Sequence, residues 1–283
     1  MTSKIVDLRE AVTSVTDGSH LALGGFAITR NAVAVAHELV RAGRRDLNVT
    51  QVIGGIETDL LAAGDCIGKL TYSGGSLDRF GPLHNVNRGI GDGRIEALEY
   101  SSLALTLRLL AGSLGLPSIT THSMLGSDLL EPLIREGEAV VDVDPFGGGR
   151  VVVMPALRPD IAFVHVDVAD DAGNAAVDGP RWALRETALA APRVVVIAEE
   201  RVATGEIDAN RVALPAAVVD AVVVLPRGAH PTAVHERYDF DRQHLTEYAQ
   251  SMSSGADERD AYLDRFVRGV DTHAAYLALV GAA

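Results

Sequence analysis

Asp17-Gly18-Ser19-His20-Leu21-Ala22-Leu23-Gly24-Gly25-Phe26 has the pattern of a turn, a short apolar strand and a glycine pair. Glycines that directly follow a buried strand let the backbone bend sharply and let a ligand approach the main chain. Ligands of α/β sheets bind at the carboxyl ends of the strands, which is where Gly24 and Gly25 stand. A tight strand-to-helix connection without a ligand is the alternative, because one glycine pair is a weak signal.

Two more glycine pairs follow the next two strand candidates, Leu47–Ile53 and Lys69–Tyr72. If these strands are parallel, all the pairs lie at one edge of the sheet. We therefore predict a shared glycine-lined cleft for an extended ligand arm, with these substrate-binding residues: Gly24, Gly25, Gly54, Gly55, Gly74 and Gly75. Independent turns in a chain with 28 glycines are the alternative.

Short Val/Ile/Leu runs alternate with longer amphipathic stretches along the whole chain. The remaining predicted strands are His20–Leu23, Ile95–Tyr100, Ser118–Thr120, Val151–Met154, Ile161–Val166, Arg193–Ala198 and Ala221–Leu225. The predicted helices are Leu8–Val15, Val33–Arg41, Leu103–Ala111, Trp182–Ala190 and Glu258–Val280. Nearly continuous apolar strands alternating with helices predict an α/β fold: an open, mostly parallel sheet with helices on both faces.

No linker-like segment divides the chain, so we expect a single domain over residues 1–283. The stretch Glu131–Gly149 lacks a clean period and holds a glycine run, and we interpret it as an excursion or β-ribbon. No apolar stretch reaches the roughly 18–20 residues that a membrane-spanning helix needs. The first eight residues lack the pattern of a signal peptide.

The net charge and the number of cysteines exclude several classes of function. Twenty-five Lys and Arg against 38 Asp and Glu give a net charge of −13, which opposes non-specific binding to nucleic acid. The single cysteine, Cys66, excludes an intramolecular disulfide framework and any cysteine-based metal cluster. We expect a cytoplasmic protein with no nucleic-acid partner and no membrane association. The nine histidines form no convincing metal-ligand pair, so we predict no metal, and His165 is interpreted as a core histidine.

Seven motifs run in order from residue 17 to about residue 250. The first is Asp17-Gly18 with Gly24-Gly25-Phe26, and the others are Ala111-Gly112-Ser113-Leu114-Gly115-Leu116-Pro117, Ser123-Met124-Leu125-Gly126-Ser127-Asp128, Asp144-Pro145-Phe146, Pro155-Ala156-Leu157-Arg158-Pro159-Asp160, Ala169-Asp170-Asp171-Ala172-Gly173-Asn174 and Gly228-Ala229-His230-Pro231-Thr232. Together they resemble family I coenzyme A transferases, in particular the α subunit of the glutaconate CoA-transferase branch. The chain departs from the first signature at Arg30 and Ala32, where the family usually has glycine and proline, and this predicts a looser loop.

The resemblance implies an enzyme that moves CoA between a thioester and a carboxylic acid through a glutamyl-CoA intermediate. It implies a β subunit that carries the nucleophilic glutamate within a Ser-Glu-Asn-Gly type motif, in an α2β2 or larger assembly. No such motif occurs in this chain. Glu199 and Glu200 are the alternative nucleophiles, although a solvated surface is the favoured interpretation of that pair. The resemblance implies no bound cofactor, since the coenzyme A thioester is a substrate.

Counting along the resembling segment places Ser102 where related transferases hold the thioester oxyanion with a glutamine. A hydroxyl at a helix start can donate to an oxyanion, and it can equally be an N-cap, as can Ser101. Glu99, at the end of the preceding predicted strand, is the second catalytic candidate, as a general base. Phe26, Ser123 and Gly126 complete the predicted substrate-binding residues by the same resemblance.

Two other functions stay open at this point. One is a CoA-thioester hydrolase or carbon–carbon lyase subunit on the same fold, and the other is a non-catalytic acyl-CoA-binding protein. A fold alone does not decide among them, because function depends on the site.

Overall fold

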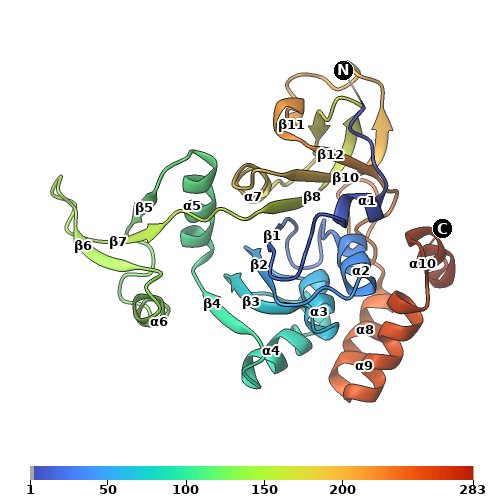
Figure 1. The fold of residues 1–283 in the computed structure, drawn as a ribbon, viewed down its shortest axis with the longest axis horizontal. Helices are drawn as coiled ribbons and strands as arrows, with labels where there is room; N and C mark the ends of the chain where they lie inside the picture. Colours follow the sequence, from blue (N-terminus) through green and yellow to red (C-terminus); the bar gives the residue numbers. More distant parts are fainter. Residues whose placement is uncertain (1–2, 283) are drawn as a thin grey trace.

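The computed structural model describes residues 3–282 and has two parts, a body built on a large sheet and a projecting arm (Figure 1). The body's sheet has nine strands. Its parallel part runs in the order β4-β3-β2-β1-β8-β10-β12, and β9 and β11 add antiparallel pairs at one side. The predicted open, mostly parallel sheet is confirmed.

The strands of this sheet are β1 His20–Leu23, β2 Leu47–Gln51, β3 Ile67–Tyr72, β4 Glu96–Glu99, β8 Ile161–Asp170, β9 Ala175–Ala176, β10 Val194–Val202, β11 Val212–Leu214 and β12 Ala221–Val224. Their buried apolar side chains alternate between two cores. Leu21, Val49, Phe163 and Ile197 face one core, and Val164, Val166 and Val196 face the other. Burial on both faces explains why β8, β10 and β12 contain nearly continuous apolar runs in the sequence.

Helices cover both faces of the sheet. The larger core is covered by α1 Leu8–Val12, α2 Val33–Arg41, α3 Ile56–Ala63, α4 His84–Gly91, α8 Arg242–Ser254, α9 Ala256–Leu263 and α10 His273–Val280. The opposite face is covered by α7 Leu184–Leu189, whose Leu184 and Ala188 pack on Val164 and Val194. The predicted helix Glu258–Val280 is wrong as one element, because a π-helical turn at Asp264–Arg268 and a break before Thr272 separate α9 from α10.

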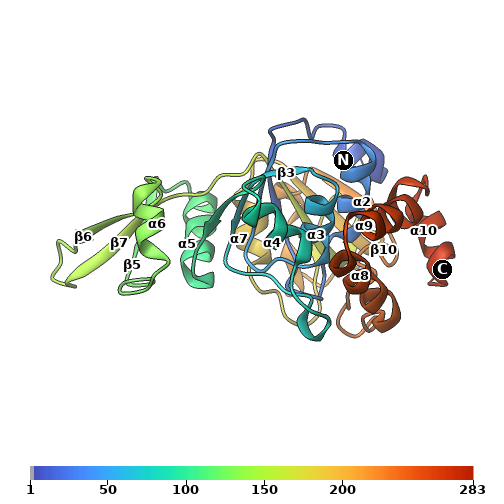
Figure 2. The ribbon, with the colours of Figure 1, turned by 90° about the horizontal axis from the view of Figure 1, so that it is seen from below.

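The arm extends from the body and contains a three-stranded antiparallel sheet (Figure 2). Its elements are α5 Ser102–Ser113, β5 Ser118–Thr121, α6 Leu130–Arg135, β6 Val140–Val143 and β7 Arg150–Pro155. The segments predicted as strands at Ser118–Thr120 and Val151–Met154 are therefore strands, but they pair with each other in the arm. The interpretation of Glu131–Gly149 as an excursion with a β-ribbon is confirmed, with the short α6 added.

The arm has its own apolar core, centred on Leu105, Leu109, Leu133, Val152 and Met154. Large hydrophobic side chains are also exposed on it, namely Leu103, Leu114, Leu116, Ile134, Val140, Val143 and Phe146. Phe146, at the tip of the ribbon, is 96% exposed. Several exposed large hydrophobic side chains on one part of a molecule are typical of surfaces that contact another protein.

Candidate functional site

The three glycine pairs lie together at the carboxyl edge of β1, β2 and β3, as predicted from the sequence. Phe26 bridges to Ile53, Gly54 bridges to Gly75, and the Gly54 N–H donates to the Gly74 carbonyl at 2.9 Å. The turns that follow β1, β2 and β3 therefore lie side by side in the same order as the strands. This edge is where parallel α/β sheets bind their ligands.

A cavity of about 240 Å³ opens at this edge, between β1, β8, α5 and α7. Its wall includes Gly24, Gly25 and Phe26 of the first turn, together with Ser102 and Thr106 of α5. The other glycine pairs lie beside the cavity and are not part of its wall. Phe26 and Trp182 stack at the opening, with ring centroids 5.0 Å apart and an interplanar angle of 13°. Both rings are partly exposed, which makes them an apolar rim.

A cluster of buried polar side chains, Asn31, Gln51 and Glu57, contacts the first glycine turn. Glu57, fully buried at the start of α3, accepts hydrogen bonds from Asn31 Nδ2 at 2.6 Å and from Gln51 Nε2. Gln51 Nε2 also donates to the Gly24 carbonyl at 3.0 Å. Burial raises the pKa of Glu57 to about 7, although the two hydrogen bonds favour its charged form. The cluster joins the turn after β1 to the end of β2 and thereby fixes the position of Gly24.

Ser102 lines the cavity at the first residue of α5. The N-cap of this helix is Ser101, whose Oγ accepts from the Ala104 N–H at 3.2 Å. Ser102 is therefore not the cap, and its hydroxyl is exposed beside Ser73, with 3.1 Å between the two Oγ atoms. The structure thus gives the capping role to Ser101, and the oxyanion role of Ser102 stays a prediction.

The other predicted residues lie at the end of β4 and in the loop after β5. Ser123 Oγ is 2.6 Å from Ser101 Oγ, so it is tied to the cap of α5. Gly126 is exposed at φ +76° in the loop after β5, and Glu99 is exposed at the end of β4. Burial, together with the charge of Glu99, raises the pKa of Tyr72 on the neighbouring strand. None of Glu99, Ser123 and Gly126 is part of the cavity wall.

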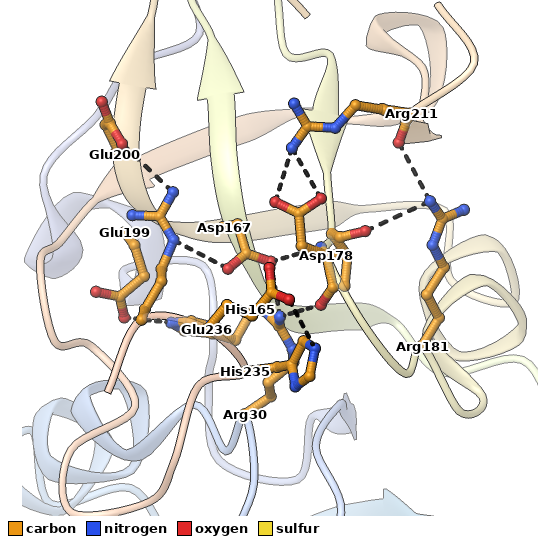
Figure 3. Close-up of polar contacts among 12 residues, drawn as sticks. Arg30, His165, Asp167, Asp178, Arg181, Glu199, Glu200, Arg211, His235 and Glu236 are labelled. Atoms are coloured by element: carbon orange, nitrogen blue, oxygen red, sulfur yellow. Dashed lines mark hydrogen bonds and ion pairs between the residues drawn. The ribbon is translucent and has the colours of Figure 1, made fainter. Parts of the chain in front are cut away.

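Arg30 does not loosen the first turn as predicted. Its guanidinium is buried, and Nη2 pairs with Asp167 Oδ2 at 2.7 Å and donates to the Asp178 carbonyl at 2.5 Å (Figure 3). Asp167 also receives Arg237 Nε at 3.0 Å and the Asp178 N–H at 2.8 Å. Arg30, which stands where the family usually has glycine, therefore connects the first glycine turn to β8 through a buried ion pair.

Glu199 and Glu200 have different environments, and the interpretation of both as solvated surface is wrong for Glu199. Glu200 is exposed, but Glu199 is 7% exposed and accepts hydrogen bonds from His165 Nε2 at 2.7 Å and from the Tyr238 hydroxyl at 2.6 Å. Burial by itself would raise the pKa of Glu199, but these bonds and one from the Arg227 N–H outweigh it and lower the pKa. His165 is buried, as expected of a core histidine, and it also lines the cavity.

Arg30 and His165 thus lie in the cavity wall, and their position there was not predicted from the sequence. The alternation of His165 and Asp167 along one strand was a usable signal, because residues two apart share a face. The pairing of Asp167 with Arg30 joins positions 137 residues apart and had no local signal.

Two negative findings hold for residues 3–282. No group of three or more His, Cys, Asp or Glu side chains is placed so as to hold a metal ion. No helix in the same range is both long enough and apolar enough to cross a bilayer.

Comparison with known proteins gives a consistent result. The family model for coenzyme A transferase matches residues 5–225. The A subunit of 3-oxoadipate CoA-transferase from Pseudomonas knackmussii is 32% identical, and the alignment covers 98% of each chain. An uncharacterized protein of Archaeoglobus fulgidus is 33% identical over 99% of this chain, which spans only 63% of that longer relative.

Two solved structures share the fold. Glutaconate coenzyme A-transferase from Acidaminococcus fermentans superposes with a TM-score of 0.93 at 27% identity, covering 99% of this chain and 93% of that one. A variant of the decarboxylase AibA/AibB superposes with a TM-score of 0.81 at 34% identity, covering 94% of this chain and all of that one. With the family model matched over most of its length, the chain belongs to the coenzyme A transferase family.

Proposed function

We propose that this chain is the A subunit of a two-chain CoA transferase that moves CoA between a thioester and a small carboxylic acid. The observation that carries the proposal is the cavity at the carboxyl edge, walled by the first glycine turn and by Ser102 at the start of α5. The similarity over nearly the full length to the A subunit of a 3-oxoadipate CoA-transferase supports it. The exposed apolar residues of the arm support a protein partner.

The partner B subunit supplies the glutamate that attacks the thioester carbonyl carbon. Charge then develops on the carbonyl oxygen, and the Ser102 hydroxyl donates a hydrogen bond to it, helped by the positive end of the α5 dipole. The CoA thioester is a substrate, and the reaction needs no bound cofactor. In this proposal the enzyme assembles as α2β2 or larger and works in the cytoplasm.

We expect the purified single chain to transfer no CoA, because it has no Ser-Glu-Asn-Gly type motif. Glu186 is the one carboxylate in the cavity wall formed by the described residues, so it is the residue to test as an alternative nucleophile. Co-expression with a B-type chain that carries a Ser-Glu-Asn-Gly type motif should give CoA exchange between acetyl-CoA or succinyl-CoA and a panel of acids. Robust turnover by the single chain that disappears in Glu186→Gln would place the nucleophile in this chain and contradict the proposal.

Ser102→Ala in the assembled enzyme should lower turnover about 100-fold, the low end of the loss expected for one oxyanion donor. Its melting temperature should stay near that of the wild type, because Ser101 and not Ser102 caps the helix. Ser101→Ala is the matched comparison, and we expect it to cost about 1 kcal/mol of stability through loss of the cap. Wild-type turnover in Ser102→Ala, measured by CoA exchange, would remove the oxyanion role.

Decarboxylation is the second candidate function, because the decarboxylase AibA/AibB is 34% identical in sequence and covers nearly the whole chain. The same co-expressed protein distinguishes the two reactions. Release of CO₂ from a carboxylated acyl-CoA without exchange of CoA between acids would favour the decarboxylase.

A further inference from the structure

Two large aromatic side chains of the cavity wall, Phe26 and Trp182, are accessible from solvent. Trp182 is 43% exposed and Phe26 is 37% exposed, whereas Leu23, Arg30 and His165 in the same wall are at most 2% exposed. The two rings stack nearly parallel, although Phe26 belongs to the first glycine turn and Trp182 to the segment before α7. An acyl group that fills the cavity therefore contacts an aromatic surface made of both rings.

The backbone holds Trp182 in an unusual conformation on a fixed segment. Its φ is +40°, in the left-handed region that bulky residues rarely adopt, and residues in such conformations gather at ligand-binding sites. The segment is anchored at Asp178, whose carboxylate accepts from Arg211 Nη2 at 2.7 and 2.8 Å and whose carbonyl accepts from Arg30 Nη2 (Figure 3). Helix α7 begins two residues after Trp182. The indole ring is therefore held between two anchored points of the chain.

The space beside the rings is small and mostly apolar. Its volume of about 240 Å³ lies below the roughly 300–1,000 Å³ of pockets that bind drug-sized ligands. The partly exposed charged residues of the wall, Arg181 and Glu186, have opposite signs, so together they favour neither an anion nor a cation. The apolar side chains of the wall, besides the two rings, include those of Leu23, Val52, Ile53 and Leu184. Such a space suits the short aliphatic part of an acyl group.

We propose that Trp182 is a specificity-determining residue that, stacked on Phe26, limits the length of the acyl group that the enzyme accepts. The inference rests on the proposed function and adds the residue that selects among its substrates. Ser102 and Trp182 line the same cavity, so an acyl chain whose carbonyl oxygen lies at Ser102 meets the indole ring once the chain is long enough. The anchored backbone keeps the ring from moving aside, and a longer chain is excluded.

The decisive variant is Trp182→Ala, assayed in the assembled enzyme with butanoate and decanoate as CoA acceptors. The ratio of kcat/KM for decanoate to kcat/KM for butanoate should rise at least about tenfold, because one misfitting methylene in an apolar pocket already changes kcat/KM about 10–200-fold. Trp182→Phe should keep the ratio near that of the wild type, because a phenyl ring can still stack on Phe26. Both variants keep a Cβ at the left-handed position, so they differ only in the ring.

Leu279→Ala is the matched control. Leu279 has the same exposed fraction as Trp182, 43%, but it lies on α10 and outside the cavity wall. This variant should leave the ratio unchanged. It also tests the other role open to an exposed aromatic ring, which is contact with the B subunit. Failure of Trp182→Ala to assemble with the B-type chain, where Leu279→Ala assembles, would assign Trp182 to that interface and overturn the proposal.

Binding can also be measured without turnover. Trp182 is the only tryptophan of this chain, so the difference in fluorescence between the wild type and Trp182→Phe reports on this ring, and butanoate should change it. In calorimetric titrations the wild type should bind butanoate more tightly than decanoate, and Trp182→Ala should reverse that order. An unchanged order in Trp182→Ala would contradict the proposal. If the wild type transfers no CoA to any acid, the proposed function fails, and the titrations alone still decide whether Trp182 limits the length of the bound acid.

Discussion

The free energy of unfolding should fall by about 3 kcal/mol or more between pH 7 and pH 5, because this chain buries several neutral histidines. Burial lowers the pKa of His20, His244 and His273 to about 4, and it lowers that of His37 well below the ordinary value of 6.5. His244 and His273 lie with His37 around Tyr276, where α2, α8 and α10 meet. Protonating any of these rings in place would put a charge into an apolar core.

The sign follows from the protons that each state binds. The unfolded chain takes up protons on these histidines below pH 6.5, whereas the folded chain does so only near pH 4, so stability is complete above pH 6.5 and is lost as the pH falls toward 4. Glu57 and Asp59 oppose this trend, because burial raises the pKa of Glu57 to about 7 and raises the pKa of Asp59 as well, so the folded state binds these protons first. Four histidines outweigh these two carboxyl groups, at about 1.4 kcal/mol for each net proton and pH unit.

Urea unfolding at pH 7, 6 and 5 measures this dependence. His37→Phe removes a ring that packs edge-on against Tyr276 at 4.7 Å between centroids, and it should flatten the pH dependence by about one proton. His122→Gln is the control, because His122 is exposed in the arm and should leave the slope unchanged. Equal or greater stability at pH 5 than at pH 7 would show that these histidines are charged in the folded protein.

Gly55→Ala should destabilise the protein by about 3 kcal/mol and lower the melting temperature by about 6–12 °C. Gly55 precedes α3 at φ −133°, which alanine tolerates, so the cost comes from packing alone. A Cβ there would overlap the carbonyl oxygen of Ala27 and approach the side chains of Asn31 and Glu57. The backbone of the first glycine turn would have to move, and the buried cluster that holds Gly24 would move with it.

Gly91→Ala is the control for this substitution. Gly91 is the last residue of α4, and a Cβ there meets no atom within 4 Å. Alanine is the better helix former, so this variant should be as stable as the wild type or more so. Thermal unfolding of the two variants measures the difference, and a wild-type melting temperature for Gly55→Ala would mean that the turn can shift freely.

The sheet could be predicted from the sequence because strands such as β8, β10 and β12 are buried on both faces and contain continuous apolar runs. The helix Val33–Arg41 was predicted with its observed bounds, since its apolar face has a clear period. By contrast α3 was missed because its polar residues Glu57, Thr58 and Asp59 are consecutive and buried, so its sequence has no helical period of polar and apolar residues. The mostly polar α8 was missed because few apolar residues mark its buried side, namely Leu245, Tyr248, Ala249 and Met252.

The candidate site was predictable where it depended on local sequence. The glycine pairs follow directly from the ends of the predicted strands, whereas Ser102 was predicted only from the resemblance to related transferases. The Arg30–Asp167 and His165–Glu199 pairs depend on which strands lie side by side, and the order β1-β8-β10 brings together segments that are distant in the sequence. Such pairs become visible only when the strand order is known.

Helix α5 connects the arm to the cavity, so a movement of the arm is transmitted to the cavity wall. The 12 residues of α5 span about 18 Å at 1.5 Å per residue, with Ser102 in the cavity wall at one end. Along the same helix Leu105 and Leu109 are embedded in the core of the arm. Unless α5 bends, a force that displaces the arm must displace the Ser102 hydroxyl too, so contacts made far from the cavity can set the position of a hydroxyl within it.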